Sequence, residues 1–195
     1  MRRLALIAGA VCLTACVKTV ELNSAIAPAP GGAGRSSEAA GVVCTPGLLA
    51  YVERADFHKF ALGEPLCGAL TRSVERSYRS AQRSETPYKG QYGRVIRFYL
   101  HSSALDVRRM PDGAIRAAYS VGVAVETCGR DLTPQARKLV TGNAVVTRSD
   151  EGSGEVVKEA AEAALQQVAD NTSRLLLAGL DGPRVREAVP AAPER

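Results

Sequence analysis

The strongest constraint on the fold is a strict two-residue alternation of apolar side chains near the middle of the chain. It runs through Ile115, Ala117, Tyr119, Val121, Val123 and Val125. Because successive side chains of a β-strand point to opposite faces, these residues line one face of a strand over 115–125. A sheet with one apolar face has to be covered by a second layer of structure.

Turn signals on both sides of this strand predict neighbouring strands that run antiparallel to it. Pro111-Asp112-Gly113 precedes it, and a second turn spans 128–134. An alternating segment over 96–107 lies upstream and changes phase, which predicts a β-bulge near Ser102-Ser103. A further strand is expected over 139–147. These segments together form an antiparallel meander of three strands.

Two helices are predicted from apolar stripes at helical spacing. The first opens at Gly63-Glu64-Pro65 and runs to about Arg83, with its stripe at Leu66, Leu70, Val74 and Tyr78. The second runs over about 155–178, with its stripe at Val157, Ala161, Ala164, Val168, Thr172 and Leu175. Residues 47–55 are expected to form a strand ahead of both helices.

This order of elements predicts an α+β fold. Two helices would pack on one face of a mainly antiparallel sheet of about four strands. The other face of the sheet would be exposed to water or covered by a partner.

The N-terminus has the pattern of an export signal. Met1-Arg2-Arg3 is followed by ten uncharged residues, 4–13, whereas about 20 apolar residues are needed to span a bilayer. We therefore expect a signal peptide over 1–15. Loss of Arg2 and Arg3 lowers the net charge from +5 to +3. That mild excess of cations does not indicate a nucleic-acid partner.

The run Leu13-Thr14-Ala15-Cys16 resembles the lipobox of bacterial lipoproteins. The resemblance implies cleavage between Ala15 and Cys16, a diacylglycerol on the Cys16 sulfur and an acyl chain such as palmitate on the new amine. No other cofactor is expected. Val17, where inner-membrane lipoproteins often carry aspartate, resembles the outer-membrane class, with the inner membrane as the alternative. An ordinary secretion signal with an incidental cysteine is the alternative to lipidation.

Composition divides the remaining chain into three parts. Residues 16–42, which contain Ala-Pro-Ala-Pro and a pair of glycines, are expected to form an acylated, flexible tether with at most a short strand over 19–22. Residues 43–180 are expected to form a single domain. Residues 181–195, with three prolines, are expected to form a disordered tail.

Three cysteines remain in the expected domain: Cys44, Cys67 and Cys128. An exported protein can form disulfides, but three thiols cannot all pair within one chain. Cys44 and Cys67 are the nearest pair, and their bridge and its absence both stay open. No Cys-x-x-Cys or Cys/His cluster is present, so no metal site is expected.

The search for catalytic groups finds no nucleophile elbow, P-loop or zinc-protease motif. The two histidines, His58 and His101, stand alone in the sequence. We therefore expect no enzyme, although a deep polar pocket with either histidine beside a carboxylate would argue for one.

A more pointed pattern lies on the first predicted helix, where four arginines fall on one side, opposite its apolar stripe: Arg72, Arg76, Arg79 and Arg83. Guanidinium groups bind phosphates through paired donors. The stripe predicts binding of lipid headgroups or an acidic partner, and an ordinary solvated face is the alternative.

The order of elements behind an acylated cysteine resembles a group of small envelope lipoproteins. The group includes the auxiliary lipoproteins of ABC-type lipid transporters, the lipopolysaccharide-assembly lipoprotein and YajG-like lipoproteins. The segment 60–66, Phe-Ala-Leu-Gly-Glu-Pro-Leu, is similar to the helix start of the auxiliary lipoproteins, with Phe in place of Trp and Leu62-Gly63 inserted.

The resemblance implies a membrane-anchored, non-catalytic accessory subunit of an envelope transport or assembly system, with an envelope protein as its partner. One alternative is direct binding of phospholipid or lipopolysaccharide through the arginine-striped helix. Another is a structural lipoprotein of the envelope.

Overall fold

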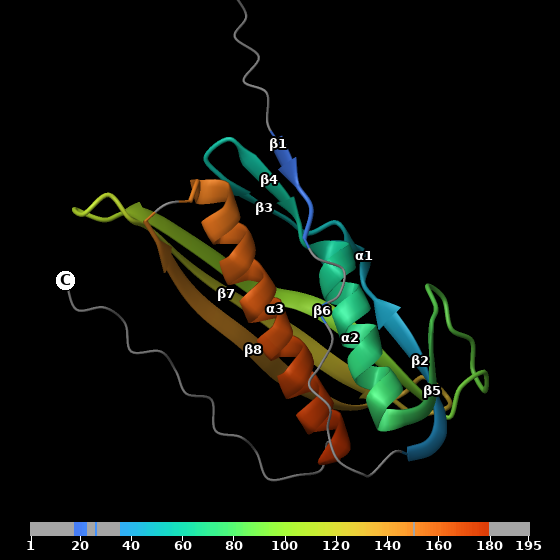
Figure 1. The fold of residues 1–195 in the computed structure, drawn as a ribbon. Coiled ribbons are helices and arrows are strands. Elements are labelled where there is room, and N and C mark those ends of the chain that lie inside the picture. The colour runs from blue at the N-terminus through green and yellow to red at the C-terminus, as the bar shows by residue number, and fades with distance from the viewer. Residues whose placement is uncertain (1–17, 23–25, 27–35, 150, 180–195) are drawn as a thin grey trace, which may run out of the picture.

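A computed structural model describes residues 18–22, 26, 36–149 and 151–179. These residues form three helices and eight strands, and the strands are arranged in two sheets (Figure 1). In chain order the elements are β1 (Lys18–Val20), β2 (Ser36–Cys44), α1 (Pro46–Leu49), β3 (Val52–Ala55), β4 (His58–Ala61), α2 (Gly63–Ser77), β5 (Tyr78–Arg83), β6 (Arg94–Arg109), β7 (Ile115–Cys128), β8 (Pro134–Arg148) and α3 (Ser153–Leu177).

The larger sheet has five strands in the order β5-β2-β6-β7-β8. Strands β6, β7 and β8 form the antiparallel meander that the two turns predicted. The predicted bulge is present, at His101, because the pairing with β7 shifts between Leu100 and Ser102. Strand β2 enters the sheet between β5 and β6 and runs parallel to both.

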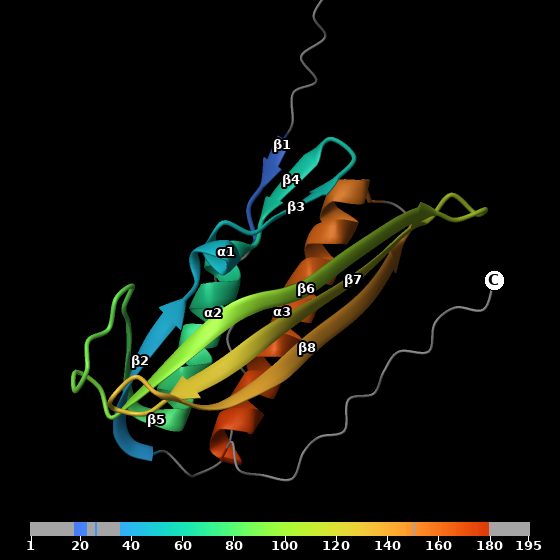
Figure 2. The ribbon, with the colours of Figure 1, turned by 180° about the vertical axis from the view of Figure 1, so that it is seen from behind.

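Helices α2 and α3 lie side by side on one face of this sheet (Figures 1 and 2). Helix α3 packs against β7 and β8, and α2 packs against β2 and β5. The predicted stripe of α3 is buried from Val157 to Thr172. No described element covers the other face of the sheet, which is turned toward the viewer in Figure 2.

The smaller sheet has the order β1-β4-β3 and lies at the end of the molecule where α3 begins (Figures 1 and 2). Strands β3 and β4 form an antiparallel hairpin joined by Asp56 and Phe57. Asp56 adopts a φ of 51°, the left-handed conformation common in such two-residue turns. Strand β1 runs parallel to β4, with Lys18 opposite His58.

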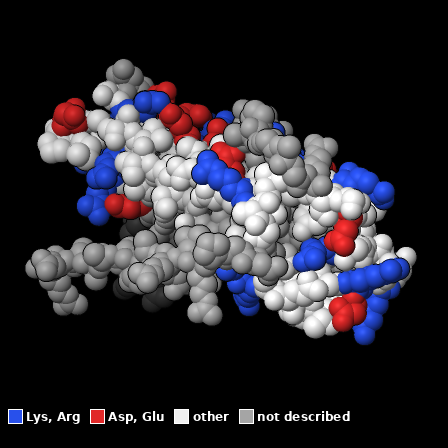
Figure 3. All heavy atoms as spheres, turned by 90° about the horizontal axis from the view of Figure 1, so that it is seen from below, with Lys and Arg blue, Asp and Glu red and all other residues white. Residues whose placement is uncertain are grey.

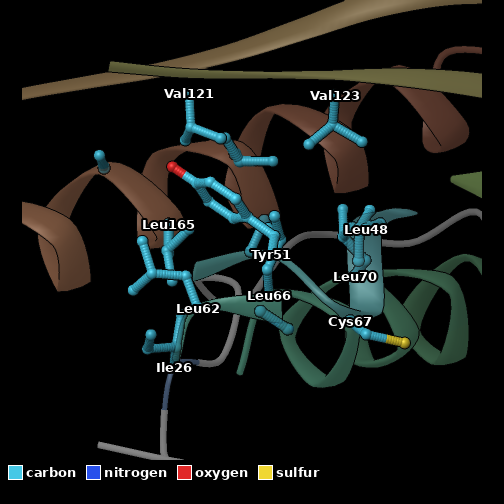
Figure 4. Packing of buried hydrophobic residues seen from close by; sticks show 14 of the residues in the cluster. Ile26, Leu48, Tyr51, Leu62, Leu66, Cys67, Leu70, Val121, Val123 and Leu165 are labelled. Carbon is cyan, nitrogen blue, oxygen red and sulfur yellow. The ribbon is translucent and has the colours of Figure 1, made fainter. Parts of the chain in front are cut away.

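One apolar core joins the helices and both sheets. Figure 4 shows Tyr51 in this core among Leu62, Val121 and Leu165, which come from three distant parts of the chain. At the edge of the core, a disulfide joins Cys44, the last residue of β2, to Cys67 in α2. The bridge therefore fixes the central parallel strand to the helix that covers it.

The predicted fold class is wrong in the number of sheets and strands. In place of one mainly antiparallel sheet of about four strands, the described residues form sheets of five and three strands, each with parallel pairs, and a third helix, α1. The missed strands lack the apolar alternation on which the prediction relied. Strand β2 reads SSEAAGVVC, β5 reads YRSAQR and β4 has only the four residues HKFA, whereas the short strand considered over 19–22 corresponds to β1.

The element boundaries differ in three further places. Residues 47–55 hold α1 and β3 instead of a single strand. Helix α2 ends at Ser77, where Tyr78 takes an extended conformation and starts β5. Residues 36–42 belong to β2, so the sheet begins within the expected tether. In the part of the chain that the structure describes, no helix is both long and apolar enough to cross a membrane.

Candidate functional site

The four arginines singled out in the sequence do not form one helical stripe. Arg72 and Arg76 lie on α2, whereas Arg79 and Arg83 lie on β5, because the helix ends before them. The Arg72 Nε donates a hydrogen bond of 2.9 Å to the carbonyl oxygen of Ile26. The predicted geometry of an arginine-striped helix is therefore wrong.

Arg83 is also engaged within the protein. Its two terminal nitrogens donate hydrogen bonds of 2.7 and 3.0 Å to the carboxylate of Glu64. These bonds hold the pKa of Glu64 below its ordinary value. In the view of Figure 3, basic side chains are dispersed among acidic and uncharged ones and do not merge into one patch.

A surface pocket of about 370 Å³ lies between β1, β4 and the first turn of α3. Its lining carries both signs of charge, with Lys18 and Lys158 as cations and Glu21 and Glu155 as anions. The rest of the lining is Thr19, Val20, His58, Gly152 and Gly154. One wall of the pocket is thus formed by residues 18–21, which lie close after the expected lipidation site in sequence.

His58 packs tightly into the wall of this pocket. Its ring lies so close to Gly154 that a Cβ atom there would stand 2.8 Å from Nε2. Its Nδ1 atom is buried and has no hydrogen-bond partner among the described residues. The imidazole is therefore positioned by packing.

The pocket brings His58 together with Glu21 and Glu155, the combination that would argue for an enzyme. His101, the other histidine, is exposed at the bulge in β6. The absence of catalysis stays a prediction.

A buried polar chain lies between the two sheets and was not predicted from the sequence. The Tyr51 hydroxyl donates to the carboxylate of Glu53 and lies 2.7 Å from the Tyr119 hydroxyl. Since Tyr51 has one proton to donate, Tyr119 donates to Tyr51. Burial raises the pKa of Tyr51 to about 12 and raises that of Tyr119 as well. The chain connects Glu53 of β3 to Tyr119 of β7.

A second polar cluster is centred on Glu126, on the sheet face that the helices leave open. Tyr99 donates a hydrogen bond of 3.1 Å to this carboxylate, and Arg97 donates one of 3.3 Å. The thiol of Cys128 lies 3.7 Å from the same oxygen, and its burial raises its pKa. The Arg137 guanidinium sits over the Tyr99 ring, 4.9 Å from its centre. The feature of the sequence that could have indicated this cluster is Glu126, the only acidic residue in β7.

Ala15 and Cys16, the signal peptide, most of the expected tether and the expected tail lie outside the described residues. Within the described ranges, no three His, Cys, Asp or Glu side chains gather in a way that could hold a metal ion. The predicted site residues that the structure locates are thus the four arginines and the disulfide pair Cys44 and Cys67.

Comparison with known proteins gives a fold likeness without sequence similarity. No family model and no curated protein matches the chain. A protein of Xanthomonas campestris from the DUF330 family matches with a TM-score of 0.57 and 10% identity, over 82% of this chain and 94% of that one.

Two further structures match more weakly. A putative lipoprotein of Caulobacter crescentus has a TM-score of 0.48 and 10% identity, over 73% of this chain and 90% of its own. A minor lipoprotein of Acinetobacter baumannii has a TM-score of 0.46 and 9% identity, over 74% and 93%. At such identities the comparison establishes the fold that this chain shares with the Xanthomonas protein.

Proposed function

We propose that the protein is a lipoprotein of the bacterial envelope, anchored by acyl chains on Cys16, whose domain acts as a non-catalytic accessory subunit of a transport or assembly system. The observation that carries the anchor is the lipobox at residues 13–16, placed after a charged start and an apolar run.

The anchor has a direct test. Cells that express the full chain are grown with an alkyne-bearing fatty acid, and the protein is examined for label and for membrane association. The unaltered protein should carry the label and sediment with membranes, whereas Cys16→Ser should do neither. An unlabelled wild-type protein that stays out of the membrane fraction would contradict the proposal.

The surface best suited to a partner protein is the open face of the five-stranded sheet. Two large apolar side chains of β8 project from it, Leu139 at 42% exposure and Val145 at 58%. Their neighbours in sequence, Val140, Ala144 and Val146, belong to the core on the opposite face. The buried core of a protein interface is more apolar than the rest of the protein surface, so this face suits the centre of such an interface.

Site-specific photo-crosslinking tests this surface in intact cells. A photoreactive residue at Val145 should capture one envelope protein repeatedly. The same residue at Ala163, exposed on α3 over the other face of the sheet, should not capture it. Equal capture of abundant envelope proteins from both positions would count against a specific partner on the open face.

The absence of a catalytic role is part of the proposal. It is supported by the sequence, which contains no nucleophile elbow, P-loop or zinc-protease motif. Membrane localisation in the outer rather than the inner membrane rests on Val17 alone, and density-gradient separation of the labelled membranes would decide between them.

A further inference from the structure

The turn between β3 and β4 exposes an aromatic side chain at the tip of a hairpin. Phe57 is 67% exposed, although burying such a side chain typically contributes about 1.5–3 kcal/mol. Single exposed apolar residues are common on protein surfaces. The exposure of Phe57 therefore indicates a binding role only in combination with the residues beside it.

What lies beside it is the start of the mature chain. The backbone N–H of Lys18 donates a hydrogen bond of 2.9 Å to the carbonyl oxygen of Phe57. Lys18 follows Cys16 by two residues, which span at most about 7 Å even when fully extended. An acylated Cys16 would thus hold the hairpin tip within about the depth of one headgroup layer from the hydrocarbon.

The outer surface of the small sheet carries charges that suit phospholipid headgroups. Arg54 of β3 lies directly opposite Lys59 of β4, an arrangement that is destabilising unless an anion lies near both. Lys18 pairs with His58, so it lies next to the tip on the opposite face of the small sheet from Arg54 and Lys59, where it adds a third cation. Asp56 in the turn and Glu21, which follows β1, add two anions. A zwitterionic headgroup offers a phosphate to the cations and an ammonium group to the carboxylates.

We propose that Phe57 is a second membrane contact of this protein, inserted into the interfacial layer of the same leaflet that holds the acyl chains of Cys16. Lys18, Arg54 and Lys59 contact lipid phosphates around it. This inference rests on the proposed lipid anchor. With this contact the domain does not swing on a long tether. Its small sheet rests on the membrane, and the open face of the five-stranded sheet keeps a fixed orientation relative to the membrane.

The composition of the chain makes the proposal directly testable, because the protein contains no tryptophan. Phe57→Trp therefore places a single tryptophan at the hairpin tip, whose emission can be excited selectively over that of the tyrosines. Tyr88→Trp is the matched control: Tyr88 is 68% exposed but lies in the loop between β5 and β6, away from the small sheet (Figures 1 and 2). Both full-length lipidated variants are placed in vesicles of phosphatidylethanolamine and phosphatidylglycerol.

In vesicles whose acyl chains carry bromine, the emission of Phe57→Trp should be quenched several-fold more than that of Tyr88→Trp. Its emission maximum should also move to shorter wavelength when vesicles are added. Equal thermal unfolding midpoints of both variants and the wild type would confirm that the substitutions leave the fold intact, as expected at two exposed side chains.

The outcomes separate this proposal from the one on which it rests. Fatty-acid label on Cys16 with equal, weak quenching of both variants would overturn the membrane contact and leave the anchor standing. No label and no vesicle association would overturn the anchor itself. Protection of Phe57→Trp from aqueous iodide in native envelopes, but not in pure lipid vesicles, would assign the tip to a protein partner and overturn the lipid contact.

Discussion

Gly142 of β8 lies directly against Ala164 of α3, where a Cβ atom at residue 142 would stand 2.0 Å from the Ala164 carbonyl oxygen. The helix thereby approaches the backbone of the edge strand itself. Two polar side chains one helical turn apart on α3 can then bond to the free edge of β8. Gln167 accepts a hydrogen bond of 3.0 Å from the N–H of Asn143, and Asn171 donates one of 2.9 Å to the Thr141 carbonyl.

Gly142→Ala should force α3 away from β8. An added methyl group in a tightly packed contact typically costs about 1–3 kcal/mol, and the contact here is with backbone, which cannot rotate aside. Denaturant unfolding followed by circular dichroism would measure the loss. Gly47→Ala is the control, because no atom lies within 4 Å of a Cβ placed there. Equal stability of both variants would contradict the close contact.

Removal of both edge bonds should make β8 available to other strands. The double variant Gln167→Ala/Asn171→Ala loses two hydrogen bonds, each contributing about 1 kcal/mol, and exposes the edge of a fifteen-residue strand. We expect concentration-dependent association in light scattering. Arg174→Ala, at an exposed position of the same helix, should stay monodisperse to higher concentration; association of both proteins alike would argue against edge protection by α3.

The disulfide between Cys44 and Cys67 should contribute measurably to stability. It closes a loop with a sequence separation of 23 residues, for which the chain-entropy relation gives about 3 kcal/mol. Cys44→Ser/Cys67→Ser should unfold at a lower denaturant concentration than the oxidised wild type. A reductant should lower the midpoint of the wild type and leave that of the double variant unchanged. A reductant effect of equal size on both would point to Cys128 instead.

The sequence was informative where one face of an element is buried and the other exposed. Strand β7 and helix α3 were located to within a few residues, because the burial of Tyr119 or Val168 imposes a clear period on the chain. Strand β5 follows α2 without a break, and only the backbone of Tyr78, which turns extended, ends the helix. Neither glycine nor proline marks that position.

The candidate site was less accessible from sequence, because it depends on pairing between distant segments. The contact of Lys18 with Phe57 requires β1 to join β4 in parallel, and a three-residue strand has no readable period. The arginine stripe was wrong for a related reason. Its geometry assumed one continuous helix, and Arg79 and Arg83 left that helix when it ended at Ser77.

The hydroxyl pair of Tyr51 and Tyr119 should give the protein a specific sensitivity to alkaline pH. Burial raises the pKa of Tyr51 from 10.0 to about 12, so the folded state keeps a proton that the unfolded chain loses. The stability linked to this proton is present below pH 10 and is lost as the pH rises toward 12.

Tyr51→Phe leaves the buried Tyr119 hydroxyl and the Glu53 carboxylate without their partner, which typically costs about 1–3 kcal/mol at neutral pH. At high pH the wild type releases the Tyr51 hydroxyl proton when it unfolds, whereas the variant has no such proton to release. The difference in unfolding free energy between the two proteins should therefore narrow as the pH is raised above 10. Denaturant titrations at pH 8, 9, 10 and 11 would follow this difference. A difference in unfolding free energy that stays constant across the series would show that Tyr51 has the same pKa in the folded and unfolded protein. The hydrogen bonds of Tyr51 with Glu53 and Tyr119 would then not retain its proton.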